Sequence, residues 1–125
     1  MKNNKLTGTG VALVTPFDND FNIDFNSLEK IIEHCLKNGI DYFVVLGTTG
    51  ESVTLSIYEQ NKILEFILKI VNQRVPIVLG LGGNNTSSLL SRIEEINFND
   101  ITAILSVCPY YNKPSQEGLY RHYSE

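Results

Sequence analysis

Four short apolar runs, spaced about 30 residues apart, constrain the fold of this chain more than any other feature. They lie at residues 11–14, 42–46, 77–79 and 102–107. None shows the regular alternation of apolar and polar residues that marks a half-exposed strand, so each predicts a strand buried on both faces. Amphipathic helical patterns separate the runs, as in βαβ units. The sequence therefore predicts an α/β fold in which helices cover a parallel sheet.

Capping signals indicate where the helices between these strands begin. Asn26 and Glu29 have capping-box spacing, and Ser56 and Glu59 repeat it before the second helix. Each pair precedes apolar residues at helical spacing, which predicts one buried stripe per helix. The two later helices are expected to begin near Thr86 and at Ser115.

Two architectures fit this alternation. A doubly wound sheet of the flavodoxin type is one, and a (β/α)8 barrel, which usually needs about 250 residues, is the other. A polar loop at residues 47–50 follows the second apolar run, whereas a flavodoxin-type phosphate loop follows the first strand. Residues 118–125 carry no helix stop signal. We therefore predict an α/β fold, the TIM (β/α)8 barrel, with residues 1–125 as its N-terminal half, interrupted within the helix after strand 4.

Composition excludes several classes of function. The chain has 125 residues, 42% hydrophobic and 19% charged, with a net charge of -4, which is a globular composition without a basic surface for nucleic acid. No apolar run approaches the roughly 20 residues of a membrane span. The polar start carries no export signal, so we expect a cytoplasmic protein. Cys35 and Cys108 lack metal-ligand spacing and are expected to be reduced core thiols, with no metal and no cofactor.

The loop Gly47-Thr48-Thr49-Gly50 stands where the second strand gives way to a helix. In parallel α/β proteins the carboxyl ends of the strands carry the functional site. Glycines there allow positive φ angles and close approach of a ligand, and converging N–H groups bind anions. Threonine hydroxyls add donors that also pass protons. The same four residues fit an ordinary tight turn equally well, with the threonine side chains capping backbone groups.

A second polar cluster follows the fourth strand. Tyr110 and Tyr111 stand directly after Pro109, and two adjacent aromatics cannot both point into one small core. A phenol relays protons but is a poor base by itself, so another group must start the chemistry. The sequence has no Ser-His-Asp set and no lysine at a strand end. The nucleophile or base is therefore missing from these residues.

Two motifs resemble the dihydrodipicolinate synthases, also called 4-hydroxy-tetrahydrodipicolinate synthases. They are GTTGES at residues 47–52 and PYYNKPSQEGLY at residues 109–120, and GVA and VTPF at residues 10–17 are similar to the family's first strand. The second motif is specific, while the first is shared with other pyruvate aldolases. The resemblance implies a TIM-barrel lyase in which a lysine forms a Schiff base with pyruvate, and the enamine attacks L-aspartate 4-semialdehyde. The product enters lysine and diaminopimelate synthesis.

The resemblance also implies roles for individual residues. Thr49 would bind the pyruvate carboxylate within the turn bounded by Gly47 and Gly50, and Thr48 and Tyr111 would form the proton relay. Tyr111 is expected to reach into the site of a neighbouring subunit in a homo-oligomer, a dimer of dimers. The family's Schiff-base lysine lies beyond residue 125, which predicts that the chain alone is inactive.

A feedback site for lysine is a further feature of the family. Ser52, Asn84 and Tyr110 match its residues, but Gln60 and Ser88 stand where lysine-inhibited members carry a histidine and a glutamate. The resemblance therefore predicts weak regulation by lysine.

Two other functions are alternatives. One is a different pyruvate-dependent class I aldolase, such as N-acetylneuraminate lyase, against which the PYYNKPSQEG run argues. The other is a flavodoxin-like anion-binding module.

Overall fold

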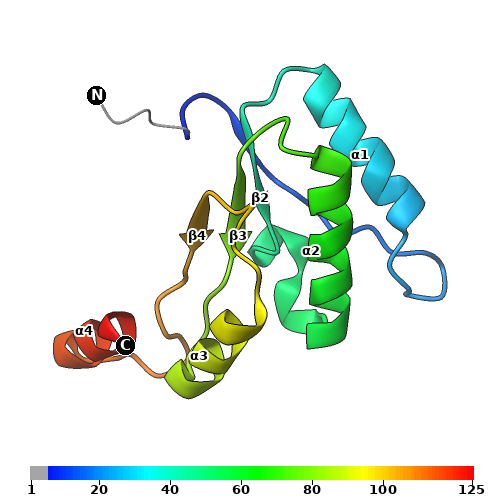
Figure 1. Ribbon diagram of the computed structural model, residues 1–125. Helices are drawn as coiled ribbons and strands as arrows, with labels where there is room; N and C mark the ends of the chain where they lie inside the picture. Colours follow the sequence, from blue (N-terminus) through cyan, green and yellow to red (C-terminus); the bar gives the residue numbers. More distant parts are fainter. Residues whose placement is uncertain (1–5) are drawn as a thin grey trace.

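Four parallel strands alternate with helices in the computed structural model, which describes residues 6–125 (Figure 1). The polar loop of the sequence forms two short 3-10 turns, η1 and η2, between the second strand and its helix. The elements are, in order, β1 Gly10–Ala12, α1 Phe25–Lys37, β2 Tyr42–Val45, η1 Thr48–Gly50, η2 Ser52–Thr54, α2 Ile57–Val71, β3 Ile77–Gly80, α3 Thr86–Glu95, β4 Ala103–Leu105 and α4 Gln116–Ser124.

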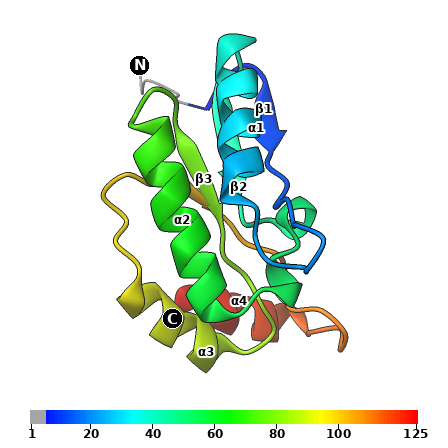
Figure 2. The same cartoon turned by 90° about the vertical axis from the view of Figure 1, so that its right-hand side faces the viewer.

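The sheet order is β1-β2-β3-β4, and all three neighbouring pairs are parallel. A flavodoxin-type sheet has the order 2-1-3-4-5, so the sequential order excludes it and agrees with the predicted barrel. Helices α1 and α2 contact each other and lie side by side over one face of the sheet (Figure 2). In the flavodoxin order 2-1-3-4-5 the second connection reverses direction, so the first two helices would cover opposite faces of the sheet.

The core lies between that face of the sheet and the two helices. Its fully buried side chains come from α1, β2, α2 and β3, and include Leu28, Ile32, Phe43, Ile63 and Leu79. These are members of the predicted strands and helical stripes, because each stripe turns its apolar side to the sheet. The described residues include no helix with the length and apolar character to cross a bilayer.

Helix starts agree with the sequence at three positions and differ at one. The Ser56–Glu59 capping box is confirmed, and α3 and α4 begin after Asn85 and Ser115. The expected cap at Asn26 is wrong: Asp24 caps α1, and its carboxylate accepts from the Ser27 N–H at 3.0 Å and the Ser27 hydroxyl at 2.6 Å. Asn26 matched only by spacing, while Asp24 is the charged acceptor at the residue that precedes the helix.

The two cysteines have different environments. Cys35 is half-buried on α1, but Cys108 is exposed, so the prediction of two core thiols is wrong for Cys108. Cys108 lies beyond β4, an edge strand that is paired on one side only. Exposed apolar side chains surround that edge, among them Ile104, Leu105 and Val107. The edge therefore lacks the covering layer that would bury a thiol there.

Candidate functional site

The loops after β2, β3 and β4 line an open cleft of about 810 Å³ at the carboxyl ends of the strands. In Figure 1 the strands run downward, and these loops lie below them. The polar groups on its lining include Thr48, Ser52, Gln60, Ser106 and Tyr110. Within residues 6–125, no charged side chain lines the cleft. Any anion bound there would be held by hydroxyl and backbone N–H groups of this chain.

The Gly47–Glu51 turn is closed by two backbone hydrogen bonds. The Gly50 N–H donates to the Gly47 carbonyl and the Glu51 N–H to the Thr48 carbonyl, each at 3.0 Å. The N–H groups of Thr48 and Thr49 begin the 3-10 turn and have no protein acceptor among the described residues. The turn therefore presents two free amide donors beside two threonine hydroxyls, and Thr48 lies on the cleft lining.

The glycines of this turn do not carry its left-handed backbone, contrary to the expectation from the sequence. Gly47 is extended, with φ of -78°, whereas Leu46 and Glu51 have φ of 54°. Gly50 instead allows close packing, because a Cβ there would lie 3.1 Å from the Leu13 carbonyl oxygen and the backbone would have to shift slightly. Two non-glycine residues thus flank the turn in a conformation that needs support from its surroundings.

Two neighbouring strands supply that support. The Thr15 hydroxyl, at the end of the β1 segment, donates to the Gly50 carbonyl at 2.7 Å, and the Thr15 side chain is 6% exposed. Gly80 at the end of β3 lets the Leu46 carbonyl approach, since a Cβ at Gly80 would lie 2.3 Å from that oxygen. Thr15 and Gly80 directly follow the predicted strands at residues 11–14 and 77–79, and no motif in the sequence predicts a role for either residue. That position was the only signal available.

Tyr110 and Tyr111 separate in the structure. Tyr110 lines the cleft, and its carbonyl accepts from the Asn84 side-chain amide at 3.3 Å. Tyr111 is 95% exposed, has φ of 73° and is not on the lining. The structure therefore does not bring Tyr111 to Thr48 within one chain.

The remaining predicted residues are divided between the cleft and the surface. Ser52 lies on the lining, and the Gln60 side-chain amide donates to the Ser52 carbonyl at 2.9 Å and the Leu55 carbonyl at 3.1 Å. Gln60 thus holds η2 against α2. Thr49 and Ser88 are exposed and do not line the cleft.

Tyr123 of α4 lies beside the end of β4. A hydrogen bond with Cys108 and partial burial raise the pKa of the Tyr123 phenol, and a hydrogen bond with Ser106 opposes that rise. Ser106 lines both the cleft and a small pocket that Tyr123 also lines, so α4 borders the site at Ser106.

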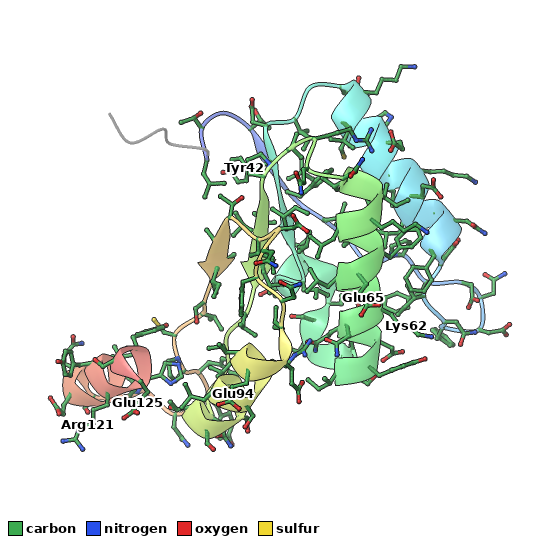
Figure 3. All side chains as sticks on the ribbon, viewed as in Figure 1. Tyr42, Lys62, Glu65, Glu94, Arg121 and Glu125 are labelled. Carbon is green, nitrogen blue, oxygen red and sulfur yellow. The ribbon has the colours of Figure 1, made fainter. Side chains whose placement is uncertain are left out.

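None of the lysines in residues 6–125 lines the cleft. Lys30, Lys37, Lys62 and Lys69 belong to α1 and α2, and Lys113 is in the loop before α4. Figure 3 shows Lys62 on the side of α2 turned away from the strands, where its ammonium lies 4.4 Å from the centroid of the Tyr58 ring. In residues 6–125 no group of His, Cys, Asp and Glu is arranged to hold a metal ion.

Comparison with known proteins agrees with the motifs. The sequence model of the Dihydrodipicolinate synthetase family matches residues 5–125. A 4-hydroxy-tetrahydrodipicolinate synthase of Azobacteroides pseudotrichonymphae is 50% identical over 118 residues, which cover 94% of this chain and 40% of the relative. A monomeric dihydrodipicolinate synthase variant superposes with a TM-score of 0.88 at 41% identity, covering 96% of this chain and 40% of that one.

A third relative was solved with a small molecule. The chloride-inhibited dihydrodipicolinate synthase from Acinetobacter baumannii, complexed with pyruvate, superposes with a TM-score of 0.87 at 42% identity, covering 93% of this chain and 40% of that one. The chain thus spans about 40% of the length of the relatives it matches. Its four parallel βα units are the first units of their (β/α)8 barrel. The chain therefore belongs to the dihydrodipicolinate synthetase family.

Proposed function

We propose that residues 1–125 are the N-terminal part of a 4-hydroxy-tetrahydrodipicolinate synthase, a cytoplasmic lyase that condenses pyruvate with L-aspartate 4-semialdehyde on the route to diaminopimelate and lysine. The observation that carries the proposal is the Gly47–Glu51 turn, which offers hydroxyl and free amide donors at the carboxyl ends of the strands. An uncharged cleft with these donors suits a small carboxylate. The Acinetobacter baumannii relative, which was solved with pyruvate, supports this choice of ligand.

Each residue of the turn has a distinct task in this proposal. Thr49, which follows the cleft-lining Thr48 in the turn, holds the pyruvate carboxylate together with the free N–H groups. Gly50 lets the turn pack against the Leu13 carbonyl. Thr48 lies on the cleft lining, and its hydroxyl accepts and passes on a proton during the condensation. The residues between Gly47 and Gly50 are thus divided between binding and proton transfer.

The second relay residue acts in another subunit. The Tyr111 side chain is almost fully exposed on its own chain. Its hydroxyl therefore completes the relay of a second copy in a homo-oligomer, a dimer of dimers. A proton relay needs hydroxyls within hydrogen-bond distance, which only the second copy provides. The relative described as a monomeric variant supports oligomers as the common state among its relatives.

The Schiff-base lysine belongs to the part of the relatives that this chain does not cover. The described lysines lie on α1 and α2 or in the Lys113 loop, and none of them lines the cleft. Residues 1–125 therefore bind and orient pyruvate but do not activate it, and the isolated chain is inactive.

A regulatory site at Ser52, Asn84 and Tyr110 is a further part of the proposal. The Gln60 amide already donates to two carbonyls, which leaves it no free donor and no charge for an amino-acid ligand. Inhibition by lysine is accordingly weak.

The test uses a full-length protein, by which we mean a polypeptide of the relatives' length that carries residues 1–125. Borohydride reduction in the presence of labelled pyruvate should attach the label to one lysine outside residues 1–125. Turnover should require aspartate semialdehyde, with N-acetylneuraminate as the control substrate. No label, or turnover with N-acetylneuraminate alone, would reject the proposal.

A further inference from the structure

We infer that Thr15 is a positioning residue, whose buried hydroxyl locks the peptide between Gly50 and Glu51 so that the Gly47–Glu51 turn stays in its pyruvate-binding form. The inference rests on the proposed function for the ligand, while its structural part stands on the geometry of the turn. Thr15 is not on the cleft lining, so it is a positioning residue and not a catalytic one.

The first step is the orientation of one peptide plane. In a trans peptide the carbonyl and the N–H point in opposite directions. The Gly50 carbonyl accepts from the Thr15 hydroxyl at 2.7 Å, and the N–H of the same peptide, on Glu51, donates to the Thr48 carbonyl at 3.0 Å. Both ends of this peptide are therefore anchored, one to the β1 segment and one within the turn.

The second step is the strain that this peptide carries. Glu51 has φ of 54°, which is unfavourable for a residue with a side chain. A flip of the Gly50–Glu51 peptide would return Glu51 to a negative φ and relieve that strain. The flip would also separate both anchored groups from their partners, and the Gly50 carbonyl would leave a buried hydroxyl without an acceptor.

The third step is the consequence for the site. Thr48 and Thr49 belong to the same short turn, and a flip of its last peptide breaks the hydrogen bond from the Glu51 N–H to the Thr48 carbonyl. The Thr48 carbonyl shares its peptide plane with the Thr49 N–H, so the flip frees that donor to change direction. Thr15 thus links the end of the first strand to the donors that follow the second. The hydroxyl matters for this link, and the methyl group of Thr15 only fills space.

A hydroxyl deletion separates these roles. In the full-length protein, Thr15→Val keeps the shape and removes the donor, while Thr15→Ser keeps the donor. Loss of the bond should lower the population of the competent turn about tenfold, which raises the KM for pyruvate by up to that factor. Bound pyruvate selects the competent turn, so kcat at saturation should stay within about threefold. Thr15→Ser should restore the KM.

Hydrogen exchange provides a readout that does not depend on pyruvate. In Thr15→Val, the amides of residues 47–55 should exchange faster, while those of α1 should not. Ile32→Val, which shortens a fully buried side chain of α1, controls for general destabilisation and should leave the KM unchanged. Should Thr15→Val fail to fold, Thr15→Ala and Thr15→Ser form the comparison, since they differ by one oxygen.

The outcomes separate the inference from the proposed function. Wild-type exchange and KM in Thr15→Val, or equal defects in Thr15→Ser and Thr15→Val, would overturn the role of the hydroxyl. A wild-type protein that takes no pyruvate would overturn the proposed function, and the exchange experiment would still test the peptide lock.

Discussion

Backbone conformation at single residues shapes the candidate site more than side-chain charge does. Leu46, Glu51 and Tyr111 all have positive φ angles, and they flank the two loops from which the proposed relay is built. Such residues cost of order 1–3 kcal/mol each and persist only where the surrounding structure fixes them. The site is therefore held in place by its neighbours, and substitutions in those neighbours should be felt at the turn.

Gly80 is the clearest of these neighbours. A Cβ there would lie 2.3 Å from the Leu46 carbonyl oxygen and 2.7 Å from the Gly47 nitrogen, both of which are backbone atoms. Because backbone cannot rotate away, Gly80→Ala should destabilise the full-length protein by about 1–3 kcal/mol and weaken pyruvate binding. Gly83→Ala is the matched control, since its Cβ would meet only Leu89 side-chain atoms at 3.9 Å or more. Equal melting temperatures for the two variants would contradict this account.

Tyr111 tests the relay. Tyr111→Phe removes only the hydroxyl from a side chain that is 95% exposed on its own chain, so the stability of the subunit should hardly change. General acid–base groups contribute roughly 10²–10⁴-fold, and kcat in the full-length protein should fall by about that factor. The KM for pyruvate should change far less, because Thr49 and the turn amides hold the carboxylate.

Thr48→Val provides the partner measurement for that experiment. It should reduce kcat by a similar factor, and the double variant should be little worse than either single one, because members of one relay are not additive. Near-normal turnover in Tyr111→Phe would instead make Tyr111 a packing residue at the subunit contact.

At the scale of elements, helix caps connect stability to pH. Hydrogen bonds from the Ser56 hydroxyl and N–H lower the pKa of Glu59 below its ordinary value of 4.5. A carboxylate whose folded pKa is depressed contributes stability that is complete above its unfolded pKa and is lost as the pH falls through the folded pKa. The capping box of α2 should therefore stabilise the protein at neutral pH and weaken below pH 4.5.

Glu59→Gln measures that contribution. The melting temperature of the wild-type protein should exceed that of the variant near neutral pH, and the difference should shrink as the pH falls below 4.5. Glu65→Gln, on the outer side of the same helix, is the matched control (Figure 3). A difference between wild type and Glu59→Gln that is the same at neutral and acidic pH would show that the Glu59 charge plays no part.

The elements were predictable from the sequence because their signals are local. Apolar runs located the strands, and the Ser56–Glu59 pair located a helix start, since each depends on residues a few positions apart. The left-handed conformations of Leu46 and Glu51 were not predictable, because contacts between residues distant in sequence support them. The Leu46 carbonyl packs against Gly80, and the Thr15 hydroxyl donates to the Gly50 carbonyl.

Contacts between helices were also not predictable from the sequence, because they join residues that are far apart along the chain. Arg92 of α3 is 8% exposed, and its guanidinium binds Asn61 of α2 and Glu95. A buried arginine at a helical position looks in sequence like one more solvated charge. Only the packing of α3 against α2 makes it a link between two elements, so no pattern within either helix could reveal it.

At the scale of the whole molecule, residues 6–125 form a sheet with two open edges. β1 and β4 are each paired on one side, and Ile104, Leu105 and Val107 are exposed at the β4 edge. A closed barrel has no such edges, whereas an open one offers unpaired N–H and C=O groups to other chains. In the relatives, the remaining 60% of the length is available to cover them, since 40% is matched here. In residues 6–125 each of the four strands is thus followed by its helix, while the sheet stays open at both edges.

The isolated chain should therefore differ from the full-length protein in two measurable ways. Its open edges should make it associate as its concentration rises, which light scattering would detect, while the full-length protein keeps one defined size. Reduction with borohydride and labelled pyruvate should leave it unlabelled, because the described lysines lie on helices or in the Lys113 loop and none meets the cleft. Full-length protein treated in parallel shows that the trapping works. Stable labelling of any lysine within residues 1–125 would mean that this chain activates pyruvate by itself, and the assignment of the Schiff base to the rest of the barrel would be wrong.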